Sequence, residues 1–172
     1  MRSLRIALAL LAVVVLHVLG TRISPVFPVG VDLFAVLVIT VALEGSPLEA
    51  MLVGMFAGLT ADALSGGPFG LNGFADTILG FGTASVVLRL GKIKAGWLLV
   101  IYALAAALQQ GVLVLLALLL ASRLVQPPLM EVVLKVVTTA LIGYIFIHMR
   151  HRMYRMLGKM EEQRATRLRF KP

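Results

Sequence analysis

Residues 95–121 form a run of 27 residues without a charged side chain, and this run restricts the possible folds more than any other feature of the chain. A helix needs about 20 apolar residues to cross the hydrocarbon core of a bilayer, whereas the buried helices of soluble proteins have shorter apolar runs. Composition agrees, because 60% of the residues are hydrophobic and 14% are charged, whereas soluble domains are about a quarter charged. The chain is therefore predicted to be a membrane protein.

Five further apolar segments are separated from this run, and from one another, by short loops. We expect six transmembrane helices, at about residues 4–20, 28–43, 47–64, 72–90, 95–121 and 129–148. The first follows Arg2 and Arg5 as in a signal peptide, but no A-x-A-type cleavage site comes after it, so we interpret it as a membrane helix. The predicted fold class is an all-α polytopic membrane protein, with a six-helix transmembrane domain at 1–149 and a basic cytoplasmic C-terminal tail at 150–172.

The turn EGSPLEA, residues 44–50, contains the signals that end one helix and begin the next. Gly45 suits a C-terminal cap. Ser46 suits an N-cap, with Pro47 at the first helical position and Glu49 at the third, which is the capping-box pattern. The two flanking segments are therefore expected to form a tight helical hairpin.

The positive charges are distributed unevenly across the expected membrane. Six spans place both termini on one side, together with the loop between the fourth and fifth helices. That side carries thirteen of the sixteen Lys and Arg residues, whereas the loops on the opposite side carry only Arg22 and Arg123. Because basic loops are retained on the cytoplasmic side, we expect both termini to be cytoplasmic.

Small residues recur at every fourth position along the third segment. The stripe consists of Ser46, Ala50, Gly54, Gly58, Asp62 and Gly66. Residues with this spacing lie on one slowly turning helix face. The Gly54 and Gly58 pair forms a G-x-x-x-G motif, which permits close approach of two membrane helices. We therefore expect this helix to pack tightly against another, within the chain or in a partner.

Two aspartates and a group of glycines lie around the following turn. Asp62 is in the last turn of its helix, where the macrodipole is unfavourable. We expect compensation from Arg22, Arg123 or the N-terminus of the next helix, unless the carboxylate simply reaches the headgroups. Asp76 lies in the first turns of the next helix, where it serves either local stabilisation or function, and Asn72 is the expected N-cap. The glycines that allow a sharp reversal are Gly66, Gly67, Gly70 and Gly73.

Polar side chains elsewhere in the apolar segments need partners of their own. Gln109 and Gln110 interrupt the long fifth segment, and their amides must be paired by another helix or by a partner protein. Lys135 is expected to snorkel or to pair with Glu131, four residues earlier.

Aromatic and basic residues mark the expected cytoplasmic side. Trp97 and Tyr102 fit an aromatic belt at that interface. The tail carries eight basic residues, which are expected to contact anionic lipid or a cytoplasmic partner. The tail candidates for this contact are Arg150, Arg152, Arg155 and Lys159.

No catalytic or metal-binding pattern is present in the sequence. The chain has no cysteine and three histidines, which are too few and too scattered for a metal cluster. No H-E-x-x-H or plausible Ser, His and Asp set occurs, and neither intramembrane aspartate has the GxGD context of an aspartic protease. We expect a protein that is not an enzyme, has no cofactor and does not bind nucleic acid.

Residues 54–82, GMFAGLTADALSGGPFGLNGFADTILGFG, resemble the central region of the MreD family of rod shape-determining membrane proteins. The shared pattern is a glycine-rich helix that ends in an aspartate, here Asp62, then a short loop, here Pro68 to Gly73, and a return into the next helix. The resemblance implies a non-enzymatic protein of the bacterial inner membrane that binds MreC. It also implies action with MreB, RodA and the paired transpeptidase of RodA in lateral peptidoglycan synthesis.

The MreD fold is also similar to the substrate-binding S component of energy-coupling vitamin transporters, which is the alternative function. Such a protein needs a pocket lined with polar and aromatic groups, and 7% aromatic residues is a low content for a vitamin pocket. S components also carry an Ala-x-x-x-Ala patch in their first helix, whereas Ala7, Ala9 and Ala12 have a different spacing here. Both points favour the scaffold.

Overall fold

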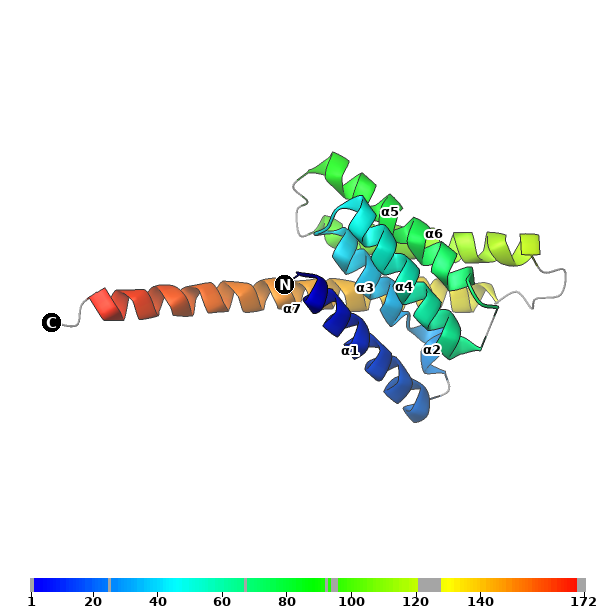
Figure 1. Ribbon diagram of the computed structural model, residues 1–172, viewed down its shortest axis with the longest axis horizontal. Coiled ribbons are helices and arrows are strands. Elements are labelled where there is room, and N and C mark those ends of the chain that lie inside the picture. The colour runs from blue at the N-terminus through cyan, green and yellow to red at the C-terminus, as the bar shows by residue number, and fades with distance from the viewer. Residues whose placement is uncertain are drawn as a thin grey trace.

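The computed structural model describes residues 2–24, 26–66, 68–91, 93, 96–120 and 128–169, with side chains described except at 120, 150, 151 and 153–169. Every regular element within these ranges is a helix, so the all-α prediction is confirmed. The helices are α1 (Arg2–Ile23), α2 (Phe27–Gly30), α3 (Leu33–Ala42), α4 (Pro47–Ser65), α5 (Leu71–Leu90), α6 (Trp97–Leu120) and α7 (Leu129–Arg169) (Figure 1).

Five of these helices are long and apolar enough to cross a membrane, which makes the chain a membrane-embedded protein. They are α1, α4, α5, α6 and the Leu129–Met149 part of α7. The sixth expected span corresponds to the shorter apolar stretch Phe27–Ala42. The order and approximate limits of the expected segments therefore match the observed helices.

The expected helix at 28–43 is wrong as a single element, because it divides at Asp32. Helix α2 ends at Gly30, and Asp32 is the N-cap of α3, with its Oδ1 accepting a hydrogen bond from the backbone N–H of Ala35 at 2.9 Å. An aspartate side chain competes with the helical ladder for backbone N–H groups and so favours a new helix start. The hydroxyl of Thr138 donates to the carbonyl of Gly30, which satisfies the broken end of α2.

The short helix α3 forms the centre of the bundle. Every residue of α3 after Leu33 is buried, and the helix contacts α1, α4, α5, α6 and α7. The Tyr102 hydroxyl on α6 forms a 2.7 Å hydrogen bond with the Thr40 hydroxyl on α3. Tyr102 is therefore a core residue and not part of an aromatic belt, whereas Trp97 is 62% exposed.

Helices α4 and α5 pack against each other over most of their length, side by side in Figure 1. A Cβ atom added at Gly54 or Gly58 of α4 would fall on the backbone of α5, at the carbonyl groups of Asp76 and Asn72. A Cβ at Gly80 of α5 would likewise fall on the carbonyl of Ala50. The glycine stripe is thus covered by a helix of the same chain.

The turn before α4 follows the predicted pattern at its second half only. The Ser46 hydroxyl accepts the Glu49 N–H at 3.2 Å, and Pro47 opens the helix. The C-cap of α3 is Leu43 and not Gly45, whose N–H bonds to the carbonyl of Val41 at 2.8 Å.

The two terminal helices are the least enclosed. Helix α1 has no buried residue, and its first turn is joined to α4 by an ion pair between Arg2 Nε and Glu49 Oε1 at 3.0 Å. Helix α7 is 41 residues long and extends well beyond the bundle (Figure 1). It runs without a break through the expected start of the tail at residue 150.

Candidate functional site

The carboxylate of Asp62 is fully engaged by the beginning of the next helix. Its Oδ2 accepts the N–H groups of Gly70 at 2.8 Å and Gly73 at 3.1 Å. Its Oδ1 accepts the backbone N–H of Asn72 at 3.1 Å and the Asn72 side-chain amide at 2.8 Å. Of the three compensating groups expected for Asp62, the structure selects the N-terminus of α5, and Arg123 lies outside the described residues.

Backbone conformation in the turn makes this arrangement possible. Gly66 ends α4 at φ 66° and Gly70 is the N-cap of α5 at φ 101°, both in the left-handed region that favours glycine. The expected N-cap role of Asn72 is wrong, because Asn72 lies inside α5 and directs its amide to Asp62. Asp62 therefore caps α5 from the neighbouring helix, and it is 2% exposed.

A second polar cluster lies among α3, α5, α6 and α7, and its central member is Gln109. The Gln109 amide Nε2 donates to Asp76 Oδ1 at 2.6 Å and to Asp32 Oδ2 at 3.1 Å. Lys135 Nζ lies 3.7 Å from the same Asp32 oxygen. Four residues from distant parts of the sequence thus form one connected network of hydrogen bonds and an ion pair inside an apolar bundle.

The structure shows how these polar residues are paired. Asp76 is only 1% exposed and accepts a hydrogen bond from Gln109, so it lies inside the bundle. Lys135 pairs with Asp32 and neither snorkels away from the bundle nor pairs with Glu131. Gln109 is paired by side chains of other helices of the same chain, which was one of the two alternatives expected for it. Gln110 is also buried.

Three buried polar atoms of the described residues have no hydrogen-bond partner: Asp76 Oδ2, Gln109 Oε1 and His17 Nδ1. His17 lies on α1 with its ring centroid 5.3 Å from that of Phe34 and 6.3 Å from that of Phe27. The other two atoms belong to the hydrogen-bonded Asp76 and Gln109 pair. Buried polar groups are almost always hydrogen-bonded, so each exception requires a physical reason.

The Asp32 and Gln109 contacts were not predicted from the sequence. A signal for the helix break existed, because Pro28 and Gly30 precede an aspartate that stands before an apolar run, which is a pattern of helix stop and restart. No local pattern pairs Gln109 with acids on two other helices, because that pairing depends on how the helices pack.

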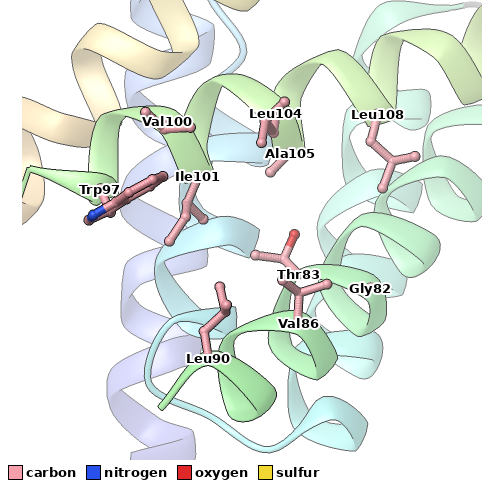
Figure 2. Close-up of a pocket in the computed structure, with 10 residues that line it drawn as sticks. All are labelled: Gly82, Thr83, Val86, Leu90, Trp97, Val100, Ile101, Leu104, Ala105 and Leu108. Carbon is pink, nitrogen blue, oxygen red and sulfur yellow. The ribbon is translucent and has the colours of Figure 1, made fainter. Parts of the chain in front are cut away.

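An apolar groove lies between parts of α5 and α6 on the outside of the bundle (Figure 2). Its volume is about 280 Å³. It is lined from α5 by Gly82, Thr83, Val86 and Leu90, and from α6 by Trp97, Val100, Ile101, Leu104, Ala105 and Leu108. A second groove of about 360 Å³ lies between α1 and α4 and includes Ser3, Leu10, Glu49 and Phe56.

The tail candidates are only partly described. Arg152 is exposed on α7, whereas the side chains of Arg150, Arg155 and Lys159 lie outside the described part of the structure. Across the residues that the structure does describe, no group of three or more acidic or histidine side chains is placed to hold a metal ion.

No family model, curated protein or solved structure matches this chain. The resemblance to MreD therefore rests on the residue pattern at 54–82, and the functional argument rests on that pattern together with the geometry above.

Proposed function

We propose that this chain is a non-enzymatic scaffold of the MreD type, which binds an MreC-like bitopic protein in the bacterial inner membrane. In this role it helps to maintain rod shape by organising lateral peptidoglycan synthesis with MreB, RodA and the paired transpeptidase of RodA. Both termini lie in the cytoplasm, as the distribution of basic residues favours. Residues 54–82, which carry the resemblance, form the α4 and α5 hairpin, with Asp62 tying the two helices together.

The groove between α5 and α6 is the observation that carries this proposal. Because α5 covers the glycine stripe of α4, Gly54 and Gly58 are not available to a partner. The groove offers a different surface, which has the small residues Gly82 and Ala105 among larger side chains such as Val86 and Leu104 (Figure 2). Small residues that let backbones approach are the usual contact of one membrane helix with another. We assign this groove to the single transmembrane helix of the bitopic partner.

Cysteine crosslinking tests the assignment directly, because the chain contains no cysteine of its own. Single cysteines would replace Val86 or Leu104 in the groove, and Leu11 on α1 would be replaced as a control, since all three side chains are exposed. Each variant would be produced with an MreC-like partner that carries one cysteine in its membrane helix. We expect disulfide-linked heterodimers from the two groove positions and none from Leu11. Equal crosslinking from Leu11, or none from the groove, contradicts the assignment.

Partner identification separates the scaffold from the alternative function. The tagged protein would be solubilised in mild detergent, and the proteins that copurify would be identified by mass spectrometry. A scaffold of this type recovers a bitopic coiled-coil protein or the wall synthases. An S component of a vitamin transporter recovers ATPase subunits and a transmembrane coupling protein, and that result overturns the proposal.

A further inference from the structure

The pair formed by Asp76 and Gln109 has two acceptor atoms without a donor. Asp76 Oδ1 accepts from Gln109 Nε2, but Asp76 Oδ2 and Gln109 Oε1 have no partner, and each side chain is 1% exposed. An unpaired buried acceptor loses its hydrogen bonds to water and gains nothing in return. Both atoms are oxygens, so a donor or a cation would satisfy them, and another acceptor would not.

The charges of the cluster also indicate that a positive charge is missing beside these two oxygens. The cluster contains two carboxyl groups, Asp32 and Asp76, and one cationic side chain, Lys135, which lies against Asp32. Asp62, a further acid that acts on Asp76, accepts four hydrogen bonds in its own turn. With both acids ionised, one negative charge remains uncompensated, and it lies on the buried carboxyl group of Asp76. An isolated buried charge is strongly unfavourable.

We propose that the Asp76 and Gln109 pair is a binding site for one monovalent cation, either a proton or a sodium ion, held by Asp76 Oδ2 and Gln109 Oε1. A proton taken from solvent would form an O–H bond at Asp76 Oδ2, and that hydroxyl would donate to Gln109 Oε1. A sodium ion would take both oxygens as ligands. Either occupant brings the single positive charge that neutralises the cluster and satisfies both free acceptors.

The groups that face the site come from five elements. Asp32 lies at the start of α3, Lys135 on α7, Asp62 on α4 and Gln109 on α6, and His17 of α1 lies near Asp32 and Lys135. Asp76 belongs to α5 and Gln109 to α6, which are also the two walls of the apolar groove. We therefore expect occupancy of the site to affect how α5 and α6 pack. The site itself does not depend on the proposed function, whereas an effect of occupancy on a partner bound in the groove rests on it.

Thermal unfolding of the purified protein in nanodiscs tests the site, with helical circular dichroism as the signal. In one arm, sodium chloride replaces choline chloride at constant ionic strength and pH. In the other arm, sodium is absent and the pH is lowered from alkaline to mildly acidic. A ligand that binds only the folded state raises the unfolding midpoint as its concentration rises. We expect a rise of several degrees in one arm, which identifies the cation as sodium or as the proton.

The variant Asp76→Asn removes the charge and supplies an N–H₂ group for Gln109 Oε1, so it imitates the occupied site. We expect it to fold, to unfold at or above the wild-type midpoint in sodium-free alkaline buffer, and to lose the cation response. Asp62→Asn is the matched control, because the same change at Asp62 places an N–H₂ donor against the N–H groups that the carboxylate now accepts. We expect Asp62→Asn to lower the midpoint and to keep the cation response.

Three outcomes overturn the proposal. The first is a wild-type midpoint that responds to neither sodium nor pH, which would indicate a neutral occupant such as water. The second is an equal response in the wild type and in Asp76→Asn, which would place the binding elsewhere. The third is an Asp76→Asn variant that fails to fold or is as unstable as Asp76→Ala, because the proposal requires that a neutral amide is tolerated at this position.

Discussion

Asp62 and Asp76 lie fourteen residues apart in one helical hairpin and are equally buried, yet their surroundings differ in kind. Asp62 accepts four hydrogen bonds, three of them from backbone N–H groups that begin α5. Asp76 accepts one, from a side chain on another helix, and keeps an unpaired oxygen. The first site is completed by its own turn, whereas the second is assembled from distant helices and left incomplete. This difference separates a structural carboxylate from a candidate ligand site.

The close packing of α4 on α5 supports both sites, so its disruption should have the largest effect. Replacing Gly54 and Gly58 together with Leu would place side chains on the backbone carbonyl groups of Asp76 and Asn72. Because backbone cannot yield as a side chain can, we expect loss of folded protein, measured as the monodisperse fraction in size-exclusion chromatography. Gly111→Leu is the control, since a Cβ at Gly111 meets no atom within 4 Å. Equal yields from both variants would refute the close contact.

Removal of the Asp62 carboxylate should have the next largest effect. Asp62→Ala leaves the N–H groups of Gly70, Asn72 and Gly73 without their acceptor, and we expect a loss of about 3 kcal/mol of folding free energy. The unfolding midpoint in nanodiscs provides the measurement, with Asp62→Asn as a milder variant. If Asp62→Ala costs no more than Asp76→Ala, the contrast between the two aspartates is wrong.

Loss of the cation beside Asp32 should have an intermediate effect. In sodium-free alkaline buffer, where the proposed cation site at Asp76 is empty, Lys135→Met leaves a second uncompensated acid in the cluster, and we expect a cost of about 1 to 2 kcal/mol, between the values of exposed and buried ion pairs. The cost should shrink in an Asp76→Asn background, because the cluster then carries one negative charge fewer. It should stay the same in an Asp62→Asn background. Unfolding midpoints of the single and double variants test this, and equal costs in all backgrounds would show that Asp76 and Lys135 are independent.

The ion pair at the start of α1 should matter least. Arg2 and Glu49 lie 3.0 Å apart, but the Arg2 side chain is 54% exposed and that of Glu49 is 28% exposed, so we expect Arg2→Ala to change stability by less than about 0.5 kcal/mol. Arg5→Ala, which removes a charge of the same helix without this pair, is the control for net charge. A larger loss specific to Arg2→Ala would mean that α1 is held mainly by this pair.

Local patterns were sufficient for much of the fold. The apolar runs predicted the positions of the membrane helices, since a run of that length must be satisfied by its own backbone hydrogen bonds in lipid. Ser46 and Pro47 marked the start of α4 correctly, because capping depends on neighbouring residues. The break at Asp32 was missed, because the apolar content of the segment outweighed its proline and glycine signals.

The candidate site was predicted less completely than the fold. The polar residues Asp62, Asp76 and Gln109 were recognised individually, because polar groups in apolar segments are conspicuous in any sequence. Their partners were not predicted, because packing of the helices brings together residues from distant parts of the chain: Asp32, Asp76, Gln109 and Lys135. Asn72 was predicted to be the N-cap because it lies just before the apolar part of the next helix. The group that accepts the first N–H groups of α5 is the carboxylate of Asp62 on α4.

By itself, the sequence determined that this protein lies in a membrane, where its apolar helices lie apart from the break at Asp32 and the far end of α7, and that α4 presents a face of small residues. These are properties of consecutive or regularly spaced residues, so local physical chemistry decides them. Only the tertiary structure decided that α5 covers this face, that Asp62 is satisfied, and that Asp76 and Gln109 keep two free acceptors. Those facts depend on distances between residues far apart in the chain, and packing of the whole bundle sets those distances.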